Sequence, residues 1–149
     1  MISIALFKPD IPQNTASIIR FSACFGIKVH IIEPCSFSID DKRFKRVVMD
    51  YMNMNNFYRY EDFENFKSEN KKSRIILMTT KSKKSYINFK FKKGDILMLG
   101  RESKGVPKEL HECIKYKIKI PINKKTRSLN VAISGAIAAS EALRQMNSK

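Results

Sequence analysis

The chain has 149 residues, 43% of them hydrophobic, which fits one packed domain over residues 1–149 and leaves little room for a second. It has no apolar run near the roughly 20 residues that a membrane-spanning helix needs and no recognisable signal peptide, so we expect a cytoplasmic protein. Its three cysteines form no CxxC motif and its two histidines have no partner at metal-ligand spacing, so we expect no metal site. Lys and Arg outnumber Asp and Glu by 29 to 14, and the net charge of +15 favours a polyanionic partner, although a Lys-rich coding bias would also produce it.

The first half of the chain predicts alternating strands and helices. The apolar run Ile2–Phe7 is short enough for a buried strand. A helix ending near Phe25 should follow, with Asp10 or Asn14 as its N-cap and Gly26 just beyond its last turn. The next predicted elements are a strand, a basic helix and a short helix: Lys28–Ile32, Asp40–Asp50 and Asp62–Phe66.

The second half continues the pattern and ends in a long helix. Strands are predicted over Arg74–Met78, Asp95–Leu99 and Tyr116–Ile120. The polar stretches Lys81–Lys93 and Asn123–Arg127 are interpreted as loops. Helices are predicted over Pro107–Cys113, with Pro107 in its first turn, and from Ser128 to about Gln145. The alternation predicts an α/β fold with a mainly parallel sheet and flanking helices.

Three polar segments follow predicted strands, where ligands bind in open α/β sheets. In the first, KPDIPQNTASIIR (residues 8–20), a helix would place Asn14, Ser17 and Arg20 along one polar strip. Arg20 could bind a phosphate or ribose oxygen, or it could be an ordinary solvent-facing arginine.

The second and third segments are also ambiguous when taken alone. In GRESKG, Gly100 and Gly105 flank Glu102, but the chain has neither a Walker A motif nor GxGxxG. In PINKKTRSLN (residues 121–130), Ser128 and Asn130 are good N-caps for the last helix. The small residues of that helix fit either a buried helix or a tight dimer seam: Ala132, Gly135, Ala136, Ala139 and Ser140.

Taken together and in this order, the three segments resemble the SPOUT superfamily of RNA methyltransferases. The resemblance is strongest to its minimal YibK-like members, which methylate the ribose 2′-OH of the tRNA wobble cytidine or uridine. The matching stretches cover essentially the whole chain: NTASIIR, HIIEP, DDKR, DY, TTK, GRESKG and SLN. The chain departs from the family pattern at Ala16, a common Gly, at Arg101, usually Pro, and at Val131-Ala132, where close relatives have Leu-Ser.

The resemblance implies a deep C-terminal trefoil knot, S-adenosylmethionine as cofactor and tRNA as substrate. It implies a homodimer in which Arg20 and the cofactor pocket come from different subunits. The implied catalytic residues are Arg20, Asn14, Ser128 and Asn130. The implied cofactor-binding residues are Met78, Gly100, Glu102, Ile120, Ser128 and Leu129. The segments Lys42–Arg46 and Lys81–Lys84 are candidates for contacts to the tRNA backbone.

Other functions stay open at this point. A ribosomal RNA ribose 2′-O-methyltransferase of the same superfamily would keep the fold and change the substrate. A non-catalytic, basic RNA-binding module would bind RNA without transferring a methyl group, although Arg20, Glu102, Ser128 and Asn130 are all present. A nucleotide-binding α/β regulator is disfavoured because the chain has no phosphate-binding loop.

Overall fold

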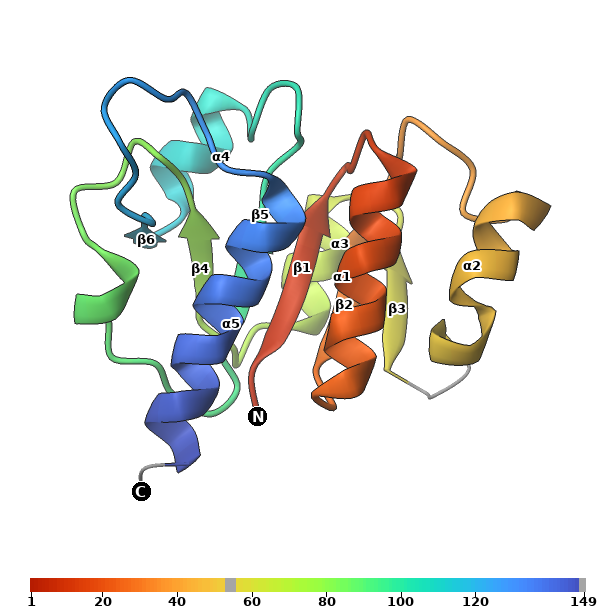
Figure 1. Ribbon diagram of the computed structural model, residues 1–149, viewed down its shortest axis with the longest axis horizontal. Coiled ribbons are helices and arrows are strands. Elements are labelled where there is room, and N and C mark those ends of the chain that lie inside the picture. The colour runs from red at the N-terminus through yellow and green to blue at the C-terminus, as the bar shows by residue number, and fades with distance from the viewer. Residues whose placement is uncertain (53–55, 148–149) are drawn as a thin grey trace.

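The computed structural model describes residues 1–52 and 56–147, which form a parallel sheet with helices on both faces (Figure 1). The strands are β1 (Ser3–Phe7), β2 (Lys28–Ile32), β3 (Phe57–Tyr60), β4 (Ile75–Met78), β5 (Ile96–Leu99) and β6 (Tyr116–Ile118). The helices are α1 (Pro12–Cys24), α2 (Lys42–Met52), α3 (Phe63–Glu69), α4 (Lys108–Cys113) and α5 (Val131–Asn147), with a 3₁₀ turn, η1, at Tyr86–Asn88. None of the helices in these two ranges is long and apolar enough to cross a membrane.

Within the described residues, the sheet has six strands in the order β3-β2-β1-β5-β4-β6, and every pairing is parallel. The strand order reverses between β1 and β5, which creates a topological switch point. In the register, Leu6 lies opposite Leu99, and Leu99 lies opposite Met78. The loops that follow β1, β4 and β5 therefore leave the sheet at the same edge. The expectation of an α/β fold with a mainly parallel sheet is confirmed.

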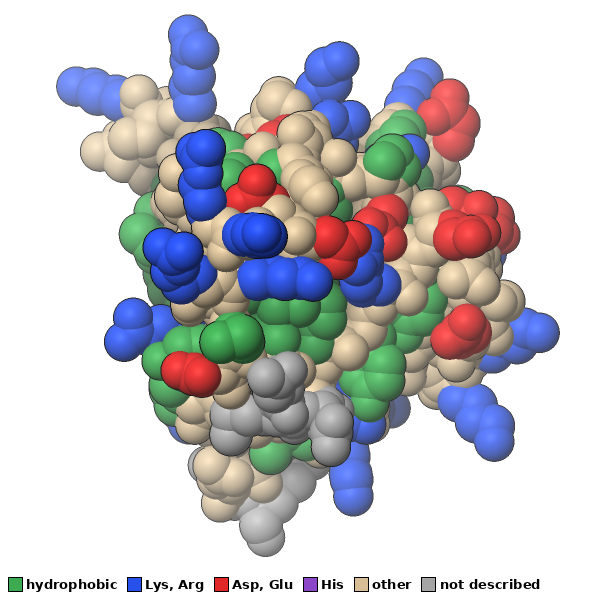
Figure 2. Space-filling model, turned by 90° about the vertical axis from the view of Figure 1, so that its right-hand side faces the viewer, with side chains coloured by type: hydrophobic (Ala, Val, Ile, Leu, Met, Phe, Trp, Pro, Cys, Tyr) green, Lys and Arg blue, Asp and Glu red, His purple; other side chains and the backbone are tan. Residues whose placement is uncertain are grey.

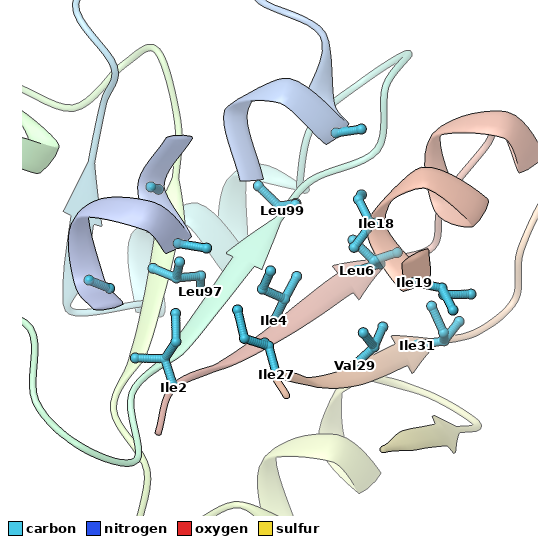
Figure 3. Close-up of a cluster of buried hydrophobic side chains, with 14 of the residues drawn as sticks. Ile2, Ile4, Leu6, Ile18, Ile19, Ile27, Val29, Ile31, Leu97 and Leu99 are labelled. Carbon is cyan, nitrogen blue, oxygen red and sulfur yellow. The ribbon is translucent and has the colours of Figure 1, made fainter. Parts of the chain in front are cut away.

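Two hydrophobic layers hold the helices to the sheet. Helices α1 and α5 cover one face, with α2 beside α1, whereas α3 and α4 lie behind the sheet (Figure 1). On the first face, Ile18 and Ile19 of α1 point toward Leu6 and Ile31 (Figure 3). Each such aliphatic side chain contributes about 1.5–3 kcal/mol when it is fully buried. On the second face, Phe66 of α3 and Leu110 of α4 join the other buried cluster.

Small residues let α5 lie close to the sheet. A Cβ atom on Gly135 would be 3.0 Å from Cδ1 of Leu99, so a larger residue would push the helix away from β5. Four alanines share this buried face of α5: Ala132, Ala138, Ala139 and Ala142. Of the five small residues singled out in the sequence, burial against the sheet accounts for Ala132, Gly135 and Ala139, whereas Ala136 is half-buried and Ser140 is exposed. Ile133, on the outer side of α5, is 51% exposed.

One local prediction was wrong, and one strand was missed. Neither Asp10 nor Asn14 caps α1: the helix begins at Pro12 after Ile11, which has no side-chain cap hydrogen bond. Strand β3 was not predicted, because FYRY is only four residues long and contains the charged Arg59. In the structure, Arg59 forms an ion pair with Glu33 at 2.7 Å. The other predicted elements are present with ends shifted by a few residues.

Part of the predicted surface loop Lys81–Lys93 is buried. Phe89 and Phe91 are 5% and 3% exposed, and their rings pack edge to face with centroids 5.0 Å apart. Gln145 of α5 fastens this segment, because its Oε1 accepts from the Phe91 N–H at 3.0 Å and its Nε2 donates to the Phe89 carbonyl at 2.9 Å. The lysines around the two aromatic residues concealed this anchoring in the sequence.

Candidate active site

A cavity of about 470 Å³ opens at the carboxyl ends of β4 and β5, beside the start of α5. This volume is in the range typical of small-molecule sites. Its lining includes Asn14 and Asn130 and all the residues predicted to bind the cofactor: Met78, Gly100, Glu102, Ile120, Ser128 and Leu129. The three polar segments of the sequence therefore do meet at one place. Arg20 is absent from the lining.

Two glycines shape the loop that follows β5. A Cβ atom on Gly100 would be 2.9 Å from both the Cα and the carbonyl carbon of Gly105, so only glycine fits this close approach. Gly105 has a φ of 63°, a conformation that costs other residues energy. Between them, Arg101 and Gly105 exchange two backbone hydrogen bonds of 3.0 and 2.8 Å. The loop thus folds back on itself at the wall of the cavity.

Glu102 connects this loop to the start of α1. Its carboxylate accepts from the backbone N–H groups of Asp10 at 2.8 Å and Ile11 at 3.4 Å. The positive end of a helix dipole favours a carboxylate at this position. The start of α1 thus receives its side-chain acceptor from Glu102, about ninety positions away in the sequence, and not from Asp10 or Asn14.

Asn14 and Asn130 extend the connection to the start of α5. The Asn14 Nδ2 lies 3.5 Å from Oε1 of Glu102, and its Oδ1 accepts from Nδ2 of Asn130 at 3.0 Å. The Oδ1 of Asn130 in turn accepts from the N–H groups of Ala132 and Ile133. Asn130 is therefore the cap of α5, as one of the two predicted candidates. Ser128 lies on the cavity wall, outside the helix.

Asp10 and Arg101 form a second connection between the same loops. The Arg101 Nη2 donates to Oδ1 of Asp10 at 2.7 Å and its Nε at 3.2 Å, while Oδ2 accepts from the backbone and hydroxyl of Ser103. The Arg101 guanidinium and the hydrogen bonds from Ser103 hold the pKa of Asp10 well below its usual range. The ion pair between Asp10 and Arg101 was not predicted. An arginine at a position where the family usually has proline was the one indication that Arg101 needs an acidic partner.

Arg20 lies on the exposed side of α1, outside the cavity of its own chain. Its guanidinium carbon is 5.7 Å from the ring centroid of Tyr51, at the end of α2. Tyr51 belongs to the DY stretch of the family resemblance, but its contact with Arg20 was not predicted. Cation–π contacts of this kind hold a long side chain in one orientation. Of the predicted catalytic residues, the structure brings Asn14, Ser128 and Asn130 together and leaves Arg20 apart.

Basic side chains lie at the cavity and on α2, among other places. Lys81 and Lys104 line the cavity. The predicted cations of α2 are exposed: Lys42, Arg43, Lys45 and Arg46. On the side of the molecule where α2 lies, Figure 2 shows Lys and Arg side chains beside hydrophobic ones. Among residues 1–52 and 56–147, no group of three His, Cys, Asp or Glu side chains is arranged to hold a metal ion.

Comparison with known proteins identifies the family. The model of the SpoU rRNA Methylase family matches residues 1–140. The chain belongs to the SpoU methylase family. Among the relatives of this SpoU methylase, the tRNA (cytidine(34)-2'-O)-methyltransferase of Ancylobacter novellus is 40% identical, over 97% of this chain and 92% of its own. The Escherichia coli K12 protein of the same name is 35% identical, over 98% and 94%.

A solved structure agrees with these relatives. It comes from a study of the 2-OH methylation of C/U34 on tRNA and superposes on this SpoU methylase with a TM-score of 0.93. The match has 31% sequence identity and covers 100% of this chain and 98% of the other. The fold of this chain is therefore that of the structure solved in that study.

Proposed function

We propose that this SpoU methylase transfers a methyl group from S-adenosylmethionine to the ribose 2′-OH of a tRNA wobble nucleotide, cytidine or uridine. The observation that carries the proposal is the switch-point cavity, where the GRESKG loop meets Asn14 and Asn130. The full-length similarity to two tRNA (cytidine(34)-2'-O)-methyltransferases supports this substrate over ribosomal RNA.

The cavity suits S-adenosylmethionine in size and chemistry. Its walls combine apolar side chains, among them Met78, Ile120 and Leu129, with backbone groups of the loop at Gly100. Adenine carries no charge, so backbone groups of Gly100 and Ile120 are suitable partners for its edge. Ser128 and Leu129 would contact the rest of the cofactor. Glu102 would act through the loop, because its carboxylate is already engaged by the start of α1.

When bound, S-adenosylmethionine supplies a methyl group on a positively charged sulfur. The chain must then align a ribose 2′-oxygen with it and stabilise the negative charge that develops on that oxygen. Arg20 is suited to hold the neighbouring phosphate and stabilise the alkoxide, because guanidinium groups bind phosphate with two hydrogen bonds. Asn14 and Asn130, which are hydrogen-bonded to each other, would keep the ribose side of the cavity in place.

A homodimer would complete the site. Arg20 is outside the cavity of its own chain, so a partner's Arg20 must reach it if this residue acts in the reaction. Half-exposed apolar residues such as Ile133 of α5 are available for such a contact. Mixing two inactive variants tests this arrangement: Arg20→Ala, which should retain the dimer and cofactor binding, and Gly100→Ala, which places a Cβ atom against Gly105.

If the site is shared between subunits, each mixed dimer has one intact site, so an equal mixture recovers about a quarter of wild-type activity. No recovery after subunits have demonstrably exchanged would contradict the shared site. Loss of cofactor affinity in Arg20→Ala alone would mean that the role of this residue is misassigned.

The C-terminal trefoil knot is part of the proposal. Support comes from the path of the chain: β6 pairs with β4 at the sheet edge, whereas α5, which follows β6, packs on β5 and α1. Mechanical pulling on the two ends of the chain tests the knot. The end-to-end length of a knotted chain stays below the fully extended length of an unknotted chain, about 3.3–3.6 Å per residue. Full extension to that length would contradict the knot.

A tRNA substrate also supports a cytoplasmic location.

Transfer of labelled methyl groups to bulk tRNA, followed by nuclease mapping, tests the proposed reaction. Label on the 2′-oxygen of the wobble nucleotide is the expected result. Label only in ribosomal RNA would keep the reaction and change the substrate. Tight RNA binding without any label would favour a non-catalytic RNA-binding module.

A further inference from the structure

A second cavity, of about 420 Å³, lies between α1 and α2 and shares no lining residue with the first. Three parts of the chain form its wall: the first turns of α1, the segment before α2 and the first turns of α2. Phe37 and Phe44 contribute two aromatic rings with centroids 5.3 Å apart, and Ala16 contributes a small apolar surface. The two tilted rings and Ala16 thus give the cavity a partly apolar wall.

The cavity lies next to Arg20. Ala16 precedes Arg20 by one turn of α1, so the two residues are on the same side of the helix and about 6 Å apart along its axis. Helix α2 reaches both places, because Phe44 lines the cavity and Tyr51 contacts the Arg20 guanidinium. A nucleotide held by Arg20 would therefore have its neighbours beside this cavity.

The polar groups on the wall favour an uncharged ligand with a polar edge. Arg43 supplies a cation and Gln13 an amide, but Asp41 is also on the wall. The Asp41 carboxylate accepts from the backbone N–H groups of Arg43 and Phe44, which fixes it there. Its negative charge disfavours a phosphate inside the cavity. The exposed cations of the same helix, Lys42 and Arg46, can contact phosphates outside the cavity.

We propose that this cavity binds an unstacked nucleobase of the substrate RNA, one or two nucleotides from the ribose that Arg20 holds. A base has an apolar face for Phe37 and Phe44 and a polar edge for Gln13 and Arg43. Bases in single-stranded loops can be splayed out and bound on aromatic side chains in this way. The inference rests on the proposed function, since it takes RNA as the substrate.

Filling the cavity tests the proposal without changing the charge of the protein. Base stacking is worth about 1–3 kcal/mol, so Ala16→Leu should weaken binding of an anticodon stem-loop RNA about 5- to 150-fold. The affinity for S-adenosylmethionine should not change. The dependence of log K on log salt should keep its slope, because no phosphate contact is lost.

RNAs with a single abasic nucleotide identify the bound position. One abasic substitution in the loop should weaken wild-type binding by a similar factor and have no further effect in Ala16→Leu. A matched pair of arginine variants on α2 distinguishes contacts to the RNA base from contacts to the RNA phosphates. Arg43→Gln should weaken intact RNA more than the abasic RNA, whereas Arg46→Gln should weaken both equally and lower the salt slope by about 0.7.

An RNA affinity in Ala16→Leu equal to that of the wild type would overturn the proposal. The proposal would also fail if each abasic substitution in the loop weakened binding to Ala16→Leu as much as it weakens binding to the wild type. Loss of the dimer in Ala16→Leu, measured by sedimentation, would make the cavity a contact between copies and overturn it too. These binding measurements need no turnover, and methyl transfer by the wild-type protein tests the proposed function separately.

Discussion

Breaking the ion pair between Arg101 and Asp10 should weaken cofactor binding. The pair joins the loop after β5 to the loop after β1, with Nη2 of Arg101 2.7 Å from Oδ1 of Asp10 and side chains that are 30% and 15% exposed. Hydrogen bonds to charged groups contribute about 1.5–3 kcal/mol. If the loop must be ordered again on binding, Arg101→Ala should raise the dissociation constant of S-adenosylmethionine about tenfold, and up to about 150-fold if the whole energy is lost.

A second ion pair provides the control. Arg74 and Asp95 pair at 2.7 Å at the amino ends of β4 and β5, away from the cavity, and the Asp95 side chain is only 2% exposed. Because it would leave a buried charge unpaired, Arg74→Ala should lower the free energy of unfolding by about 3–5 kcal/mol, yet leave cofactor affinity unchanged. Calorimetric titration with S-adenosylmethionine and urea unfolding measure the two effects.

The two variants should therefore differ in which quantity they change. Unchanged cofactor affinity in Arg101→Ala, or an equal loss in Arg74→Ala, would refute the reasoning. The pKa of Asp10 is lowered in the folded state by Arg101 and Ser103, so its contribution to stability is complete above the unfolded value of about 3.9. It is lost as the pH falls below that value, so titrations near pH 7 measure the full contribution of the Asp10 carboxylate.

Three further predictions follow. Replacing Tyr51 by Leu should lower kcat about 2- to 5-fold, because the ring orients Arg20 and a cation–π contact at an exposed site contributes about 0.5–1 kcal/mol, while Phe should retain activity; equal loss with Phe and Leu would exclude the cation–π contact. Burial, assisted by the charge of Lys28, lowers the pKa of His30 from 6.5 to about 4. Between these two pH values the unfolded state binds a proton that the folded state does not bind. The free energy of unfolding should therefore fall by up to about 3 kcal/mol as the pH drops from 6.5 to about 4. Urea unfolding at pH 7 and pH 4.5 measures that loss, and a His30→Gln variant with the same pH dependence would contradict the assignment. Gly105→Ala should lower the free energy of unfolding by about 1–2 kcal/mol through its φ of 63° alone, since nothing lies within 4 Å of the added Cβ; an unchanged urea midpoint would argue against strain there.

The sequence was sufficient where the signals are local. Apolar runs such as Lys28–Ile32 predicted strands, and Asn130 was a recognisable cap for α5. The convergence of Asn14, Glu102 and Asn130 was also expected, because parallel strands end at one edge of the sheet.

The contacts that were missed join distant parts of the chain. The polar partner for the start of α1 comes from Glu102, and the ion partner of Arg101 is Asp10; no local pattern encodes either pairing. The position of Arg20 beside Tyr51 depends on how α2 packs against α1, which periodicity does not determine. Strand β3 needed its neighbour β2 to define it.

The central claim is methyl transfer to one ribose hydroxyl of tRNA. The most direct measurement uses two tRNAs of identical sequence, one with ribose and one with 2′-deoxyribose at the first anticodon position, incubated with the protein and labelled S-adenosylmethionine. We predict label in the ribose form and none in the deoxy form. Equal label in both tRNAs would place the methyl group elsewhere and contradict the account.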